Sequence, residues 1–177
     1  TFTPDVHHNV GRLNVFGVAG RIVVVDYAHN ESGLAALIEF SRSLMSPTGR
    51  LCVVIGTAGD RQDEGFVALG HVAAAGANGI YLKETPKYLR GRGAGEGPAI
   101  MRATIEADGA GDRLFGAVLS EHDALLAALD ACEAGDAIAV MCVEEQLRVF
   151  GMLRDRGARP WDAASGGPHH GRTPDGR

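Results

Sequence analysis

Polar side chains gather at the points where three apolar, strand-like segments of the chain end. The segments are 22–25, 51–55 and 80–82, and the last of them leads into the most basic loop of the sequence. Carboxylate, imidazole, amide and guanidinium groups together are suited to holding a hydroxylated, anionic ligand. The side chains concerned are Asp26, His29, Asn30, Asp60, Arg61, Lys83, Arg90 and Arg92.

Buried strands and the helices that follow them must position these side chains. The four consecutive apolar residues 22–25 cannot alternate between a buried and an exposed face, so they predict a strand that is covered on both sides. A helical pattern begins at Glu31, with Asn30 or Ser32 as its N-cap. Because open α/β sheets place their ligands at the carboxyl ends of the strands, we expect the three loops to gather along one edge. Asp26 has the best case among their side chains, since a carboxylate at the end of a buried strand needs hydrogen-bond donors or a ligand.

Strand and helix patterns alternate along most of the chain. Strands are predicted at 12–18, 21–26, 51–55, 80–82, 115–119 and 137–143, and helices near 31–45, 66–76, 97–107, 121–133 and 144–154. A tight turn at Ala19-Gly20 joins the first two strands into a β-hairpin. The pattern predicts an α/β fold with a mostly parallel sheet, helices on both faces and an antiparallel hairpin strand at the edge.

Length and composition favour one folded domain between two polar ends. The chain has 177 residues, of which 45% are apolar, and this is enough to form a core. Residues 1–10 are interpreted as an incoming linker and 11–160 as the domain. Residues 161–177 are predicted to be a disordered tail, because their composition buries too little apolar surface to offset the entropy of ordering.

Charge, hydropathy and cysteine usage exclude several classes of partner. The net charge of −5 argues against nucleic acid, and no apolar run approaches the roughly 20 residues that a membrane span needs. Without a recognisable signal peptide, a cytoplasmic protein is expected. Cys52, Cys132 and Cys142 lack metal-ligand spacing and are predicted to be buried thiols. The pair His7-His8 has no third ligand in view, so we predict no metal site.

The sequence contains no recognisable catalytic constellation. It has no serine in a nucleophile elbow, no cysteine with a base nearby in sequence and no HExxH pattern. The glycine cluster 56–60 matches a dinucleotide fingerprint only loosely and favours a tight strand-to-helix turn, and no GxxxxGK[ST] phosphate loop is present. The basic loop 83–92 is interpreted either as a binding loop or as a solvated surface. We therefore predict binding residues but no catalytic residue.

Several motifs in combination resemble the carboxyl-terminal domain of the Mur ligase superfamily. They are DYAHN at 26–30, preceded by Gly11-Arg12, and GTAGDR at 56–61. The LKE at 82–84 with RGR-x-x-GE at 90–96 is most similar to the cyanophycin synthetase branch. The resemblance covers roughly residues 11–153, and it implies a Rossmann-like three-layer sandwich.

The resemblance also implies an activity. Such ligases use ATP to activate a carboxylate as an acyl phosphate, and an amine then displaces the phosphate to form an amide. ATP and Mg²⁺ would be held mostly by a preceding central ATPase domain of the same polypeptide, over which this domain closes. The guanidinium fork suits the carboxylate of the incoming amino acid and favours the arginines over Lys83 for that contact. Implied contacts with ATP come from Arg12, Asp26, His29 and Asn30, and implied contacts with the amino acid come from Lys83, Arg90 and Arg92.

Departures from the family pattern leave two alternatives open. The chain has no phosphate loop, so by itself it is not expected to turn over ATP, and it lacks the Asp-Asn-Pro-Arg pattern of the peptidoglycan ligases. The first alternative is a non-catalytic binding or assembly module that contacts a partner chain. The second is a small α/β oxidoreductase domain, which the incomplete glycine fingerprint disfavours.

Overall fold

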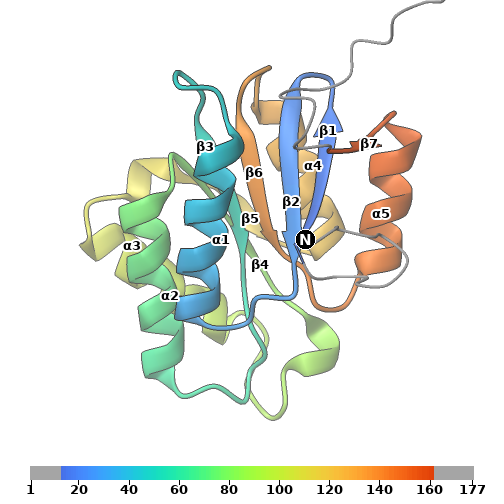
Figure 1. The fold of residues 1–177 in the computed structure, drawn as a ribbon. Helices are drawn as coiled ribbons and strands as arrows, with labels where there is room; N and C mark the ends of the chain where they lie inside the picture. Colours follow the sequence, from blue (N-terminus) through green and yellow to red (C-terminus); the bar gives the residue numbers. More distant parts are fainter. Residues whose placement is uncertain (1–12, 162–177) are drawn as a thin grey trace, which may run out of the picture.

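A computed structural model describes residues 13–161 of the chain (Figure 1). Within them, one seven-stranded sheet has the strand order β5-β4-β3-β6-β2-β1-β7. The pairs from β5 to β2 are parallel, whereas β1 pairs antiparallel with β2 and with β7. The predicted α/β class with a mostly parallel sheet and an antiparallel hairpin at its edge is confirmed. The predicted linker 1–10, Arg12 and residues 162–177 of the predicted tail lie outside the described residues.

Between residues 13 and 161 the chain forms five parallel strands and two antiparallel ones, and helices follow most of them. The strands are β1 (Asn14–Val18), β2 (Arg21–Asp26), β3 (Leu51–Ile55), β4 (Gly79–Lys83), β5 (Leu114–Leu119), β6 (Ala137–Met141) and β7 (Arg159–Pro160). The helices are α1 (Glu31–Leu44), α2 (Asp63–Gly76), α3 (Glu96–Ala107), α4 (Glu121–Ala131) and α5 (Gln146–Asp155). Two single-turn 3₁₀ helices are η1 (Pro86–Tyr88) and η2 (Gly111–Arg113).

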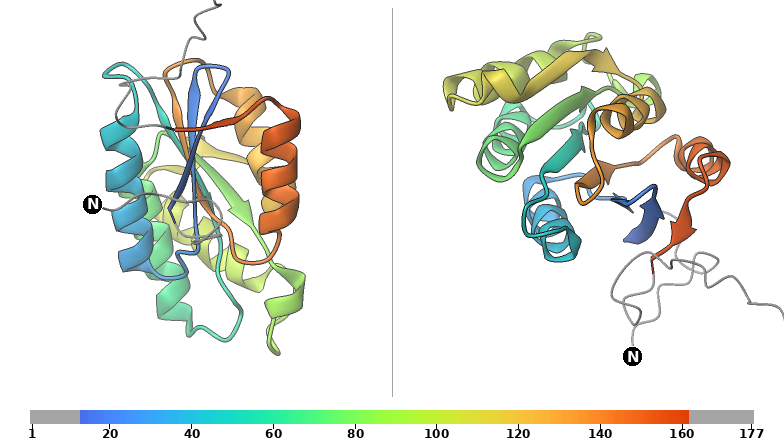
Figure 2. Two further views of the ribbon diagram at one scale, coloured as in Figure 1. Left: turned by 45° about the vertical axis from the view of Figure 1, so that its right-hand side comes forward. Right: turned by 90° about the horizontal axis from the view of Figure 1, so that it is seen from above.

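Helices cover both faces of the sheet, which gives three layers (Figure 2). Strand β2 shows why its sequence is continuously apolar. Ile22 and Val24 belong to the core shared with α1, α2 and α3, whereas Val23 and Val25 belong to the core shared with α4 and α5. Successive side chains of a strand point to opposite faces, so a sheet covered on both sides buries all of them. The predicted three-layer sandwich is confirmed.

The strand order creates a point at which neighbouring connections leave the sheet in opposite directions. From β2 and β3 the chain continues into α1 and α2 on one face. From β6, which lies between β2 and β3, it continues into α5 on the other face. Such a switch point opens a crevice at the carboxyl ends of the strands, where open α/β sheets bind ligands.

The structure corrects the predicted bounds at the end of β6. The sequence predicts a strand over 137–143 followed directly by a helix from 144, but β6 ends at Met141 and α5 begins at Gln146. Residues 142–145 form a loop instead, because Glu121 captures the backbone N–H groups of three of them. The short elements β7, η1 and η2 were not predicted, since two or three residues carry no periodic signal.

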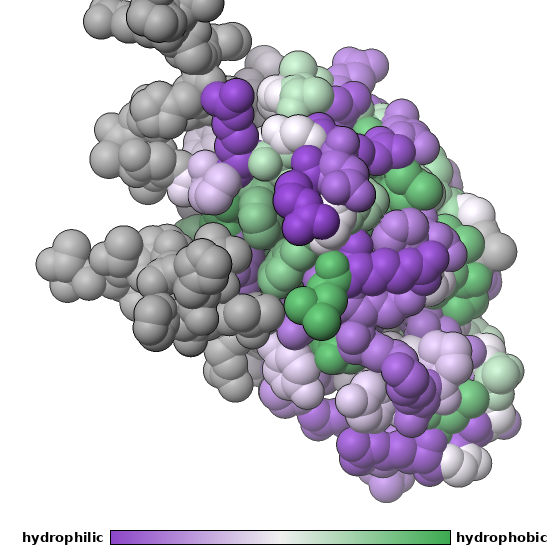
Figure 3. Space-filling model, turned by 90° about the vertical axis from the view of Figure 1, so that its right-hand side faces the viewer, coloured by the Kyte–Doolittle hydropathy of each residue, from purple (hydrophilic) through white to green (hydrophobic). Residues whose placement is uncertain are grey.

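The face that carries α5 is mostly polar. Figure 3 looks at the molecule from this side, and hydrophilic residues cover most of the coloured surface, with small separated apolar patches between them. Leu147, in the first turn of α5, is 83% exposed. Between residues 13 and 161, none of the helices combines the length and the apolar character that crossing a bilayer requires.

Replacing Ala19 by Asn is expected to stabilise the domain. Ala19 (φ 47°) and Gly20 (φ 80°) occupy the hairpin turn in the left-handed region. Asn tolerates this region better than Ala does, so the free energy of unfolding should rise by about 0.5–1 kcal/mol in urea denaturation. The same substitution at Ala36, an exposed position of α1, should lower it by about 0.5 kcal/mol because Asn has a lower helix propensity. A loss of stability in Ala19→Asn would contradict the turn geometry.

Candidate functional site

The loops after β2, β3, β4 and β6 line one open cavity of about 330 Å³ at the carboxyl ends of these strands. The predicted gathering of the loops after β2, β3 and β4 is confirmed. The loop after β6 was not among the loops that the sequence singled out. The lining residues are Tyr27, His29, Thr57, Ala58, Asp60, Arg61, Tyr88, Arg90 and Val143.

Hydrogen bonds between loops fix the walls of this cavity. The hydroxyl of Thr57 donates to the carbonyl of His29 at 2.8 Å, which joins the loops after β2 and β3. The N–H of Gly59 donates to the carbonyl of Tyr88 at 2.7 Å, which joins the loops after β3 and β4. A Cβ at position 59 would overlap the backbone of Leu89, so this close approach requires glycine.

Arg90 and Asp60 form an ion pair at the cavity. The Nη1 atom of Arg90 lies 2.5 Å from Oδ2 of Asp60, and the two side chains are 52% and 45% exposed. The guanidinium also lies 5.6 Å from the ring centroid of Tyr88. Half-exposed pairs contribute only about 0–1 kcal/mol, so an anionic ligand can compete with Asp60 for this guanidinium.

Two aromatic side chains form another part of the lining. The rings of Tyr27 and His29 lie 6.0 Å apart between centroids, and Tyr27 is 42% exposed. The Nδ1 atom of His29 lies 3.3 Å from the carbonyl oxygen of Tyr27. Aromatic surface beside a few polar groups is typical of sites that hold a planar organic ligand.

Asp26 and Asn30 shape the backbone beside the cavity and do not line it. The carboxylate of Asp26 accepts a hydrogen bond from the backbone N–H of Leu13 at 2.7 Å. The side chain of Asn30 accepts one from the N–H of Gly33 at 2.9 Å and caps α1, so Asn30 is the N-cap and Ser32 is not. The two side chains thus hold the ends of the segment that presents Tyr27 and His29.

Arg92 stabilises the loop after β3 through hydrogen bonds to its backbone. Its Nε and Nη2 atoms donate to the carbonyl oxygens of Gly59 and Arg61 at 3.1 and 2.9 Å. The guanidinium lies 4.9 Å from the centroid of the Phe66 ring and 2.8 Å from the carboxylate of Asp63. The side chain is only 18% exposed, so the structure places Arg92 behind the cavity lining.

Lys83 is buried and does not reach the open cavity. Its Nζ atom lies 2.5 Å from Oε1 of Glu121 and 3.4 Å from the hydroxyl of Thr85. The side chains of the ion pair are 0% and 1% exposed. Withdrawing Lys83 toward a ligand would leave the Glu121 carboxylate buried without its counter-charge, which is strongly unfavourable.

Glu121 was not predicted from the sequence, but among residues 13–161 it is the acidic side chain beside the site that accepts the most hydrogen bonds. Its carboxylate accepts hydrogen bonds from Lys83, from the thiol of Cys142 and from the backbone N–H groups of residues 143–145. Burial alone would raise the pKa of Glu121, but the charge of Lys83 and these hydrogen bonds lower it to about 2. Acidic residues are common in the first turn of a helix, so nothing in the sequence distinguished this one.

The amino-terminal ends of α4 and α5 cap each other. Glu121 begins α4 and binds the N–H groups that precede α5, while Glu145, the N-cap residue of α5, accepts a hydrogen bond from the N–H of His122 in α4 at 2.9 Å. Burial would raise the pKa of Glu145, but the hydrogen bond from His122 lowers it. Both carboxylates lie at the positive ends of helix dipoles, which stabilises their charge.

The cysteines and the other metal-binding side chains form no metal centre within residues 13–161. No group of three or more His, Cys, Asp or Glu side chains there is arranged to hold a metal ion. Cys52, Cys132 and Cys142 are buried thiols, as predicted. Burial and the neighbouring charge of Glu121 raise the pKa of Cys142, so its thiol stays protonated.

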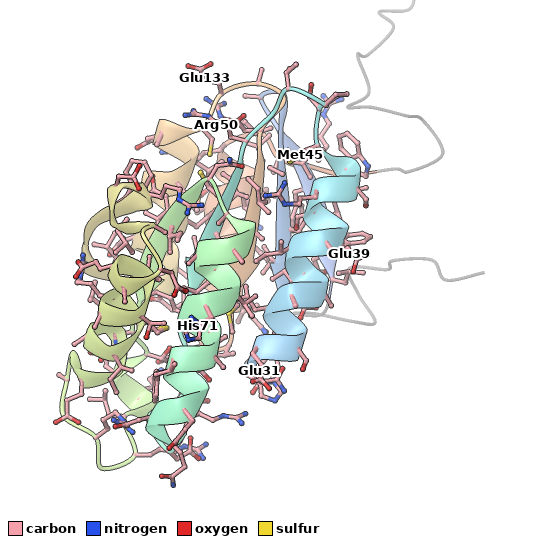
Figure 4. All side chains as sticks on the ribbon, turned by 90° about the vertical axis from the view of Figure 1, so that its left-hand side faces the viewer. Glu31, Glu39, Met45, Arg50, His71 and Glu133 are labelled. Atoms are coloured by element: carbon pink, nitrogen blue, oxygen red, sulfur yellow. The ribbon has the colours of Figure 1, made fainter. Side chains whose placement is uncertain are left out.

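The Glu121→Gln substitution is expected to lower the free energy of unfolding by about 3–5 kcal/mol, because it leaves Lys83 as a buried, uncompensated charge. Urea denaturation measures this loss. Glu39→Gln is the control, since Glu39 is exposed on the outer side of α1 (Figure 4), and it should change stability by less than about 0.5 kcal/mol. Adding Lys83→Met to Glu121→Gln should restore part of the loss. Equal stability of Glu121→Gln and the parent chain would refute the role of the pair.

The stability of the domain should also depend on pH through Glu121. Its pKa is lowered from 4.5 to about 2 in the folded state. Between these values the unfolded chain binds the proton and the folded chain does not, so stability falls as the pH falls through this window and is complete above it. In melting experiments Glu121→Gln should flatten this decline, and Glu39→Gln should keep it. Asp123 and Glu145 also have lowered pKa values and leave a residual slope.

Comparison with known proteins identifies a family and several relatives whose sequences are similar to this one. The pattern of the family described as Mur ligase, glutamate ligase domain, matches residues 11–143. Cyanophycin synthetase from Trichormus variabilis is 33% identical over 157 residues, which cover 89% of this chain and 17% of the relative. The chain therefore spans about a sixth of the length of the cyanophycin synthetases that it matches.

Solved structures share the fold at lower sequence identity. A UDP-N-acetylmuramoyl-L-alanyl-D-glutamate–2,6-diaminopimelate ligase superposes with a TM-score of 0.63 at 21% identity, over 83% of this chain and 32% of that one. E. coli FolC in complex with DHPP and ADP gives a TM-score of 0.57 at 21% identity, over 84% and 32%. These similarities concern the fold of the domain.

Proposed function

The chain belongs to the Mur ligase, glutamate ligase domain family, and from this premise we propose that it is the carboxyl-terminal domain of an ATP-dependent amide-bond ligase of the cyanophycin synthetase type. The family comprises ATP-dependent ligases. The match over residues 11–143, together with the identity to cyanophycin synthetase, carries the proposal. The cavity at the switch point of the sheet is the part of this domain that contributes to binding.

Arg90 is the residue we assign to the carboxylate of the incoming amino acid. Its side chain is half exposed and lines the cavity, and its guanidinium forms an exposed pair with Asp60 beside the ring of Tyr88. A planar guanidinium can bind a carboxylate through two parallel hydrogen bonds, which gives orientation as well as affinity. Arg92 supports this contact indirectly by bracing the loop that carries Asp60. Lys83 supports it through Glu121.

His29 lines the nucleotide side of the cavity in this proposal. Tyr27 and His29 supply aromatic surface, which suits a planar base. Asp26 and Asn30 hold the segment in place from either end, and Arg12 with Asp26 approaches the adenosine part of ATP. FolC, which shares the fold, has been solved with ADP.

A preceding central ATPase domain of the same polypeptide is the partner that we propose. That domain would hold most of the ATP and Mg²⁺, in agreement with a chain that contains no phosphate loop. When bound, ATP supplies the phosphoryl group that activates a carboxylate. The residues of this chain would orient the incoming amine and, on closure of the two domains, exclude water.

Arg90→Ala, tested in the full polypeptide that contains this chain, is the decisive substitution. Amino-acid-dependent release of ADP should show a KM for the amino acid raised about 10–100-fold, the loss expected for a charge-assisted hydrogen bond. Arg90→Lys should lie in between, because it keeps the charge and loses the fork.

Arg156→Ala is the matched control for this experiment. Arg156 also forms an exposed pair with an aspartate, Asp130, at 3.1 Å, but it does not line the cavity. Its substitution should leave the KM unchanged. Absence of amino-acid-dependent ADP release, with a panel of all common amino acids, would reject the ligase and favour a non-catalytic binding module.

A further inference from the structure

The segment 86–92 carries two cavity residues but has little packing of its own. Tyr88 and Arg90 line the cavity, yet η1 buries none of its residues and several of the residues around it are exposed. Arg92, the last residue of the segment, packs on the buried ring of Phe66, but the residues before it are exposed or half-buried, and such residues open locally at low cost in free energy. The position of the segment beside the cavity therefore depends on the polar contacts that tie it to neighbouring loops.

Several of these contacts tie the segment to the loop after β3, among them the hydrogen bonds from Arg92 to two carbonyl oxygens of that loop. The carbonyl of Tyr88 accepts a hydrogen bond from Gly59, and the guanidinium of Arg90 pairs with Asp60. If the carboxylate of an amino acid binds the Arg90 guanidinium, the ion pair between Arg90 and Asp60 is broken. The hydrogen bond from Gly59 to Tyr88 and those from Arg92 then still hold the segment to the loop after β3, and a tie to another loop would hold it from a second side.

Lys87 provides such a tie to the loop after β6. Its Nζ atom lies 2.8 Å from Oε1 of Glu144, and the hydrogen bond from Lys87 to Glu144 raises the pKa of the lysine, which keeps it charged. Lys87 is 77% exposed, but the Glu144 side chain is only 14% exposed. Solvent therefore screens this pair less than it screens a pair with two exposed members.

The backbone of Glu144 is itself held in place by the carboxylate of Glu121. Its backbone N–H donates to Oε2 of Glu121 at 3.0 Å, between the N–H groups of Val143 and Glu145, which bind the same carboxylate. Glu121 is buried and paired with Lys83 at the end of β4. A rigid, buried anchor thus presents an acidic side chain to a weakly packed segment.

We propose that Glu144 is a positioning residue for the cavity: it clamps Lys87 and so holds the segment 86–92 where Arg90 can meet a ligand. The contact of Glu144 is with Lys87 and not with the ligand, so its effect on binding passes through the segment. The consequence for the amino acid rests on the proposed function, whereas the consequence for the segment does not.

Hydrogen–deuterium exchange of this chain tests the clamp without any ligand. In Glu144→Gln and in Lys87→Met, the amides of 87–92 should exchange about two- to five-fold faster, since single partly exposed pairs make small contributions. Peptides from β3 (51–55) should exchange at the parent rate, which shows that the fold is intact. Asp130→Asn, which removes the exposed pair with Arg156, is the control and should leave 87–92 unchanged.

The double variant decides whether the two side chains act on one another. If they form one clamp, Lys87→Met with Glu144→Gln should accelerate exchange no more than either single substitution does. Additive effects, or unchanged exchange of 87–92 in both single variants, would overturn the inference.

The full polypeptide then shows whether the clamp matters for binding. Glu144→Gln should raise the KM for the amino acid about two- to five-fold with kcat unchanged, as expected for a lost contribution to ground-state positioning. An unchanged KM in an active ligase would overturn the positioning role even if exchange accelerates. A polypeptide that releases no ADP with any amino acid would reject the proposed function, and exchange alone would then decide whether the clamp exists.

Discussion

The buried ion pair between Lys83 and Glu121 holds the carboxyl edge of the sheet together. Lys83 ends β4, Glu121 begins α4, and the carboxylate also takes three backbone N–H groups of the loop between β6 and α5. Burying two charges costs desolvation, and only a complete set of hydrogen bonds offsets it. Because both carboxylate oxygens of Glu121 accept hydrogen bonds from more than one donor, the pair specifies one arrangement of these segments.

The cavity is built in two tiers of different rigidity. The lower tier consists of the buried Glu121 pair and of two half-buried contacts, the hydrogen bonds of Arg92 and the glycine contact between the loops after β3 and β4. The upper tier is exposed and consists of Arg90, Asp60 and Lys87. Strong contacts below hold the backbone in place, whereas weak ones above leave guanidinium and carboxylate groups open to exchange partners with a ligand.

The division also separates the residues that line the cavity from those that support it. Sequence motifs of the family draw attention to both kinds equally, since a lysine or arginine in a basic loop looks the same in either role. His29 and Arg90 lie at the cavity. Lys83 and Arg92 carry the same charge but turn inward, where carbonyl oxygens, a carboxylate and an aromatic ring surround them.

Local sequence determined the longer helices and strands of this domain, the hairpin turn at Ala19-Gly20 and the edge of the sheet at which the polar loops meet. These features follow from apolar periodicity and turn chemistry, which act over a few residues. The tertiary structure alone decided that Lys83 meets Glu121, which is 38 positions away, and that 142–145 form a loop. No local pattern encodes that pairing, because it depends on which strands the crossovers place side by side and on which donors a buried carboxylate finds there.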